Sequence, residues 1–76
     1  MLLPNKIYTY KQSIIPQMVV VLKEIEKAPC DVSALYDILH DHFENIGQYI
    51  ETLDCLYALG RIDFNDSKGL YYVKIN

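Results

Sequence analysis

The clearest hydrophobic pattern in the chain lies in residues 46–59. Apolar side chains recur there at steps of three and four residues, which places them on one face of an α-helix: Ile46, Tyr49, Ile50, Leu53, Leu56 and Tyr57. Asn45 precedes this run as a suitable N-cap, and Gly60 follows it, where a helix end favours a residue free to adopt positive φ. The pattern therefore predicts a helix over residues 46–59.

A β-hairpin is predicted directly after this helix. Two runs rich in β-branched and aromatic residues, 61–65 and 70–75, flank the polar connector Asp66-Ser67-Lys68-Gly69. Two such runs around a glycine-containing connector are typical of a hairpin with a loop of about four residues. A hairpin over residues 61–75 is expected.

A first helix is predicted over residues 14–27, with Ser13 as N-cap and Pro16 in the first turn. Its core stripe consists of Ile14, Met18, Val21, Leu22 and Ile25. Ile15 and Val19 widen the stripe to about 160°, while Val20 falls outside it. We interpret this as a central helix contacted from two sides; the alternative is a second apolar face that binds a partner.

The remaining segments complete the expected topology. Residues 7–12 alternate weakly with period two, which indicates either a short strand beside the hairpin or a loop. After a break at Ala28-Pro29-Cys30, Asp31 caps a second helix over 32–43, whose inward residues are Val32, Leu35, Tyr36, Ile38, Leu39 and Phe43. Three helices and a hairpin predict a winged helix-turn-helix of the α+β class, as one domain spanning residues 1–76.

The composition limits what this domain does. The chain has 76 residues and a formal net charge of −3, and no run approaches the ~20 apolar residues of a membrane span. Pro4 follows the opening three residues at once, which argues against a secretory signal, so a cytoplasmic protein is expected. The two cysteines, Cys30 and Cys55, are expected to be reduced and unpaired.

Charge is distributed unevenly along the chain. Residues 31–60 contain six carboxylates and no Lys or Arg, a formal charge of −6, whereas the rest of the chain has seven Lys or Arg residues and four acids. The outward face expected for the third helix comprises Gln48, Glu51, Thr52, Asp54, Cys55 and Ala58. Such a face repels phosphates, which argues against DNA binding through this helix. The open alternative is a small dimeric DNA-binding regulator that uses the hairpin cations Arg61, Lys68 and Lys74.

No catalytic, cofactor or metal site is expected. His40 and His42 are two residues apart, whereas helical metal ligands need three or four, and Cys30 and Cys55 have no zinc-ligand spacing. No nucleophile with a paired base, phosphate-binding glycine loop or carboxylate pair is recognisable. We therefore expect a protein that is not an enzyme.

The hairpin offers the most usable surface for a protein partner. Because neighbouring residues on a strand point to opposite faces, one of Tyr71 and Tyr72 is expected to face the core and the other outward. An apolar patch is expected from Leu70, Tyr72 and either Phe64 or Ile62, and an exposed strand edge can add to a partner's sheet. The candidate partner-binding residues are Phe64, Lys68, Leu70, Tyr71 and Tyr72.

Three segments carry a family resemblance. The opening Met1-Leu2-Leu3-Pro4, the cap Ser13 before a very apolar helix, and residues 53–63 (LDCLYALGRID) together resemble the small middle components of bacterial ABC-three-component systems. The sixth middle-component type is the one indicated. The likeness covers nearly the whole chain in length and order of elements.

The resemblance implies a non-catalytic adaptor that works beside an SMC-like ABC ATPase and a variable effector. Systems of this kind, Lamassu-like ones among them, are associated with defence against phage and plasmids. By analogy with the winged-helix end of kleisins, the adaptor would contact the ATPase head or the base of its coiled coil. The expected partners are thus the ATPase and an effector subunit, with a homodimer as an open alternative.

Overall fold

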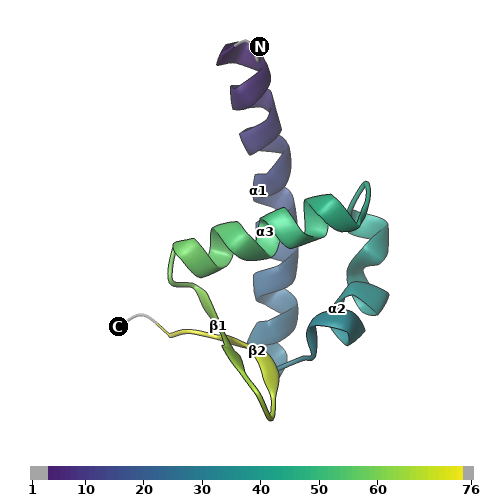
Figure 1. Cartoon of the computed structure of the whole chain (residues 1–76), viewed down its shortest axis with the longest axis vertical. Helices are drawn as coiled ribbons and strands as arrows, with labels where there is room; N and C mark the ends of the chain where they lie inside the picture. Colours follow the sequence, from purple (N-terminus) through teal and green to yellow (C-terminus); the bar gives the residue numbers. More distant parts are fainter. Residues whose placement is uncertain (1–3, 75–76) are drawn as a thin grey trace.

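The computed structural model describes the backbone of residues 4–74 and the side chains of residues 14–74. Its elements are α1 (Pro4–Lys27), α2 (Val32–Leu39), the short 3-10 helix η1 (His40–His42), α3 (Ile46–Ala58), β1 (Ile62–Asn65) and β2 (Gly69–Tyr72). In Figure 1, α3 crosses in front of α1, α2 lies to one side, and the hairpin lies at the C-terminal end of α1. Three helices followed by an antiparallel hairpin packed on them confirm the predicted α+β class, consistent with a winged helix.

Helix α1 is longer than the sequence pattern predicts. It begins at Pro4, so Ser13 lies inside the helix instead of capping it. Residues 7–12 are also helical, so both alternatives predicted for them, a short strand or a loop, are wrong. Pro4 at the first helical position costs no hydrogen bond because the first N–H groups of a helix have no intrahelical partner. Pro16 is also inside α1, where its ring removes one backbone donor without ending the helix.

Only one side of α1 contacts the core. Ile14, Val21 and Ile25 are buried as expected, and Val20, which was placed outside the stripe, is half-buried against the core. Ile15 and Val19 instead remain 56% and 45% exposed. The prediction that both widen the buried stripe is therefore wrong, because nothing in the described residues covers that side of the helix.

A single residue, Cys30, pairs with the hairpin on the side of β2 away from β1. Cys30 forms an isolated antiparallel bridge with Leu70, with N···O distances of 2.9 Å from Cys30 N and 2.8 Å from Leu70 N. Strand β2 is thus bonded to β1 on one side and to the segment between α1 and α2 on the other. The bridge holds the hairpin against the helices.

Helix α2 is shorter than predicted. Asp31 caps it as expected, since its Oδ2 accepts from Ser33 N at 3.1 Å and Ala34 N at 3.3 Å. The helix ends at Leu39 and continues as η1. Leu35 and Leu39 are buried, but Ile38 is 57% exposed, so its predicted inward position is wrong. The two buried residues, Leu35 and Leu39, are one helical turn apart, so this helix of eight residues buries only a narrow side.

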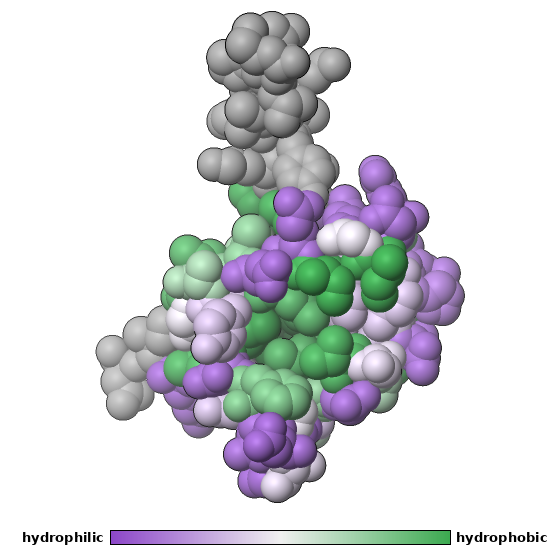
Figure 2. Space-filling view, viewed as in Figure 1, coloured by the Kyte–Doolittle hydropathy of each residue, from purple (hydrophilic) through white to green (hydrophobic). Residues whose placement is uncertain are grey.

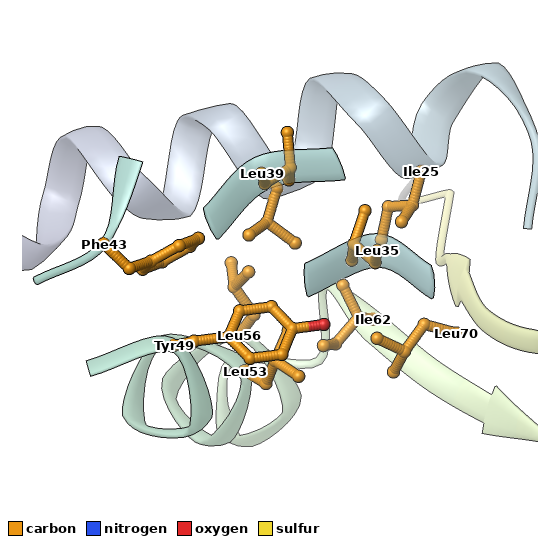
Figure 3. Packing of buried hydrophobic residues seen from close by; sticks show 10 residues of the cluster. Ile25, Leu35, Leu39, Phe43, Tyr49, Leu53, Leu56, Ile62 and Leu70 are labelled. Carbon is orange, nitrogen blue, oxygen red and sulfur yellow. The ribbon is translucent and has the colours of Figure 1, made fainter. Parts of the chain in front are cut away.

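Helix α3 is rotated relative to its predicted orientation. Tyr49, Leu53 and Leu56 are buried as expected and join residues from every other major element in one core: Val21, Ile25, Leu35, Leu39, Phe43, Ile62 and Leu70 (Figure 3). The other three residues assigned to the inward face, Ile46, Ile50 and Tyr57, are exposed. Gln48 and Thr52, assigned to the outward face, are buried.

Local hydrogen bonds explain why α3 buries these two polar residues. Asn45 Oδ1 accepts from Gln48 N at 2.9 Å, confirming Asn45 as the N-cap, and Gln48 Oε1 in turn accepts from Glu44 N at 2.9 Å. Thr52 Oγ1 donates to Gln48 O at 2.8 Å. Because these side-chain atoms find partners within α3 and its cap, their burial leaves them satisfied.

The hairpin turn depends on Gly69. The connection has three residues between Asn65 and Gly69, which pair with each other, so it is one residue shorter than predicted. Asn65 Oδ1 accepts from the N–H groups of Ser67 and Lys68, at 2.8 and 3.2 Å. Gly69 has φ +85, and a Cβ there would lie 2.6 Å from Cys30 O. Only glycine is compatible with this turn and with the close approach to Cys30.

Candidate functional site: the wing groove and the exposed face of α3

An open groove of about 470 Å³ lies where the end of α1 meets the hairpin. Its walls come from the last residues of α1, the Ala28–Pro29 break and both strands, and they comprise Ile25, Glu26, Lys27, Ala28, Pro29, Asn65, Lys68, Tyr71, Tyr72 and Lys74. We call this the wing groove. The bridge from Cys30 to Leu70 positions it, because that bridge fixes the hairpin beside the end of α1.

The wing groove is cationic. Lys27, Lys68 and Lys74 line it, against the single carboxylate of Glu26. Lys27 Nζ also lies 3.5 Å from Glu24 Oε1, an exposed pair that contributes little to stability. Lys68 and Lys74 are exposed and have no ion-pair partner among the described residues. The groove thus combines aromatic walls with cations that are free to contact an acidic group.

The structure brings three of the five candidate partner-binding residues together. Lys68, Tyr71 and Tyr72 all line the wing groove. Tyr72 lies opposite Ile62 and packs against the core, so Tyr71 lies on the other side of the strand, as predicted, although both tyrosines are half-buried. Phe64 is 52% exposed on β1 and does not line the groove. Leu70 is buried in the core at 5% exposure, so the expected apolar patch containing it is wrong.

Strand register explains these positions. Ile62 pairs with Tyr72 and Phe64 with Leu70, so these four side chains share the face of the hairpin that packs on the helices. Ile62 and Leu70 are buried in the core, whereas Phe64, although it lies opposite Leu70, is 52% exposed. Sequence alternation identified the shared face, but only the docking of the hairpin determines where the core ends.

The outer strand offers a limited edge to a partner. β1 has four residues, and the N–H of Phe64 already donates to Asp63 Oδ1 at 2.7 Å. Short edges with occupied donors are poor templates for strand addition. Contacts through side chains are therefore better supported by this geometry than addition to the sheet.

The second accessible surface is the outer face of α3. Figure 2 shows hydrophobic residues gathered over α3 and the region between α3, α2 and the hairpin, with hydrophilic residues around them. The large exposed apolar residues of α3 are Ile46, Ile50 and Tyr57. In a DNA-binding winged helix the outer face of this helix reads the major groove. Here that face combines apolar side chains with the carboxylates of Glu51 and Asp54.

The histidines lie in a different setting. His40 and His42 are exposed in η1, and His40 Nε2 lies 3.2 Å from Asp41 Oδ1 while its Nδ1 lies 3.0 Å from Asp37 O. A search of the described residues finds no group of three or more His, Cys, Asp or Glu placed to hold a metal ion. Nor does any helix in that part of the chain have the length and apolarity to cross a membrane.

Both cysteines are free thiols. Cys55 is exposed on α3, whereas Cys30 is half-buried under the hairpin. Burial raises the pKa of the Cys30 thiol above its usual value, and the carboxylates of Asp31 and Glu24 raise it further. A thiol in such surroundings is less reactive at neutral pH.

Sequence reasoning missed part of the wing groove. Lys27, Ala28, Pro29 and Asn65 line it but were not candidates. Lys27 is the last residue of α1 and precedes the proline break, which marks it as a helix end. That it lies beside Lys68, 41 positions later, depends on the tertiary bridge at Cys30 and could not be read from spacing.

Comparison with known proteins identifies the chain at the level of family. Residues 3–71 match the family model of the ABC-three component (ABC-3C) system Middle Component 7, where the sequence resemblance indicated the sixth type. Comparison with curated proteins and with solved structures found no match. The match covers almost the entire chain and agrees with the middle-component class that the sequence pattern indicated. The chain therefore belongs to the Middle Component 7 family of ABC-three-component systems.

Proposed function

We propose that this chain is a non-catalytic adaptor that binds the SMC-like ATPase subunit of its ABC-three-component system through the wing groove. Its role would be to couple the ATPase to an effector in defence against phage or plasmids, as in Lamassu-like systems. The observation that carries the proposal is the negative charge of the helix-turn-helix unit, which is positive in winged helices that bind DNA. Residues 31–60 contain no Lys or Arg, so the surface that holds DNA in other winged helices is acidic here.

The wing groove supplies the contact surface in this proposal. Tyrosine side chains combine a large apolar body with a polar tip and are enriched at protein interfaces. Tyr71 and Tyr72 lie side by side with Lys68 and Lys74 in an open hollow that would accept an acidic or aliphatic projection from a partner. Phe64, exposed on the neighbouring strand, would extend the contact.

The test is co-purification of the tagged chain with the ABC-type ATPase encoded beside it. The double substitution Phe64→Ser/Lys68→Glu changes two exposed hairpin residues and is expected to reduce ATPase recovery about tenfold, a size typical of losing an interface anchor. The matched control, Ile15→Ser/Lys23→Glu, alters an exposed apolar residue and an exposed lysine on α1 and should leave recovery within about twofold.

Two results would contradict the proposal. Absence of the ATPase from the wild-type preparation would remove the adaptor role altogether. Full recovery with the hairpin variant, while circular dichroism shows both variants folded, would move the ATPase contact away from the wing groove.

A further inference from the structure

Four residues of α3 form a continuous apolar line along its outer side. Ile46, Ile50, Leu53 and Tyr57 follow one another at steps of four, three and four residues. At 3.6 residues per turn they lie within an arc of about 60° and extend over about 16 Å. This is the a/d spacing with which one α-helix packs against another in a coiled coil. We call this line the α3 seam.

Three of the four residues of the α3 seam lie outside the protein's own core. Ile46, Ile50 and Tyr57 are 53%, 44% and 61% exposed, whereas Leu53 is buried at 8% exposure and belongs to the core. The side of α3 that packs on α1 and the hairpin instead contains Tyr49, Thr52 and Leu56. A helix with a second apolar line beside its core face has surface left for another element.

The charge around the α3 seam is negative. Asp54 and Glu51 lie on its outer flank, and Arg61, the first cation after residue 30, comes beyond the end of the helix. The whole segment 31–60 has six carboxylates and no Lys or Arg. A partner that covers the seam therefore has to bring positive charge next to its apolar residues.

We infer that the α3 seam is a docking site for a basic amphipathic helix of a partner protein. About three turns of such a helix would match the length of the seam, with its apolar residues against Ile46, Ile50 and Tyr57. Its Lys or Arg residues would lie beside Glu51 and Asp54. This site is separate from the wing groove, so the chain would contact two partner elements at once, which is what an adaptor requires.

Two other occupants fit the charge poorly. A second copy of the chain in a twofold contact would place the same acidic flank on both sides of the interface, and like charges oppose such packing. A nucleic acid would bring phosphates against Glu51 and Asp54, which electrostatic repulsion disfavours. A basic helix satisfies both the apolar line and the acidic flank.

The test uses the purified full chain and a fluorescein-labelled peptide of about 18 residues, long enough to sustain a helix. The peptide has Leu at a/d spacing and Lys or Arg at the flanking positions. Fluorescence anisotropy is expected to show binding that weakens as salt rises, since charge pairs at a surface are screened. The same peptide with Glu in place of Lys and Arg should bind at least about tenfold more weakly.

Matched variants distinguish binding at the α3 seam from nonspecific hydrophobic binding. Ile46→Ser/Ile50→Ser removes two exposed residues four positions apart on α3, and Ile15→Ser/Val19→Ser removes a pair with the same spacing and nearly the same exposure on α1. We expect the α3 pair to lower peptide affinity about tenfold or more and the α1 pair to change it less than about twofold.

A second pair of variants tests the charge. Glu51→Lys/Asp54→Lys should weaken binding of the basic peptide and create binding of the acidic one. The control Asp41→Lys/Asp66→Lys changes the net charge equally at exposed sites outside both α3 and the wing groove and should alter neither. Equal effects from the two pairs would show that the peptide is attracted by the net charge of the protein alone, and would overturn the inference.

Other results would also overturn it. Undiminished peptide binding after Ile46→Ser/Ile50→Ser would show that the seam is not the site. Dimerisation of the wild-type chain in sedimentation equilibrium, abolished by the same substitutions, would assign the seam to a second copy. Because the assay contains no ATPase, its outcome is independent of the co-purification test of the wing groove.

Discussion

At the scale of single residues, Gly69 has the least freedom to change. Its φ of +85 lies in a region that residues with a Cβ rarely adopt, and a Cβ would come within 2.8 Å of Asp31 Cα as well as touching Cys30 O. Gly60 also has positive φ, at 73, but a Cβ there would have nothing within 4 Å. A Cβ at Gly60 would therefore cause backbone strain alone, whereas a Cβ at Gly69 would cause both backbone strain and steric overlap.

We expect Gly60→Ala to lower the free energy of unfolding by about 1 kcal/mol, the usual cost of a left-handed residue with a Cβ. Gly69→Ala should lower it by about 3 kcal/mol or more, because overlap with the backbone of Cys30 and Asp31 adds to the same strain. Urea denaturation of the two variants measures the difference. Equal losses would show that the approach of the hairpin to Cys30 is looser than described.

At the scale of elements, Tyr49 joins α3 to the first turn of α2. Its hydroxyl donates to Val32 O at 2.6 Å, and its ring lies 4.8 Å from the Tyr36 ring and 5.1 Å from the Phe43 ring, measured between centroids. Figure 3 shows the ring among the apolar side chains of both helices and the hairpin. This aromatic cluster joins α2 to α3 beside the core that Leu35 and Leu39 share with Leu53 and Leu56.

Replacing Tyr49 by Phe is expected to lower the free energy of unfolding by about 1 kcal/mol, the net value of one hydrogen bond. The matched control is Tyr57→Phe, which changes an exposed tyrosine on the same helix and should cost less than about 0.5 kcal/mol. Thermal or urea unfolding of both variants at neutral pH gives the comparison. Equal effects would contradict a structural role for the Tyr49 hydroxyl.

The stability difference between the wild type and Tyr49→Phe also depends on pH. Burial raises the pKa of the Tyr49 hydroxyl above 10.0, and the negative charges of Cys30 and Asp31 raise it further. Below pH 10 both folded and unfolded chains keep this proton, so Tyr49 adds no pH dependence there. Above pH 10 the unfolded chain loses the proton first, and the stability of the wild type falls. The advantage of the wild type over Tyr49→Phe should therefore shrink above pH 10, as urea unfolding below and above that pH would show.

At the scale of the whole molecule, charge is divided between two surfaces. The α2–α3 unit is acidic, with an apolar seam, whereas the wing groove carries Lys27, Lys68 and Lys74. A molecule with two surfaces of opposite character is suited to contact two different partners. From this division we expect any contact with DNA to involve only a few phosphates at the hairpin.

We expect a labelled DNA duplex to bind only weakly at low salt and to be released at physiological salt, as measured by fluorescence anisotropy. Lys68→Glu and Lys74→Glu should abolish this weak binding of the duplex at low salt. A DNA-binding regulator would instead retain the duplex at physiological salt, with a steep salt dependence whose slope falls by about one for each lysine removed. That result would favour the regulator over the adaptor.

The sequence by itself determined the order of elements from residue 14 onwards, the bounds of α3 and the hairpin, and the location of the charge, but not the start of α1 or the end of α2. Periodicity located the three helices and the hairpin, and Asp31, Asn45 and Gly60 marked helix ends because capping chemistry is local. Each of these features depends on residues within a few positions of one another.

Only the tertiary structure decided which apolar residues are buried and which surfaces are available. The apolar arc on α3 includes both its core face and the seam, and the choice between them depends on how Gln48 and Thr52 satisfy their hydrogen bonds inside. Likewise, the wing groove exists because Cys30 pairs with Leu70, a contact across 40 positions. Packing between distant segments is not encoded in local periodicity. The buried face of α3 and the wing groove are therefore defined only by the tertiary structure.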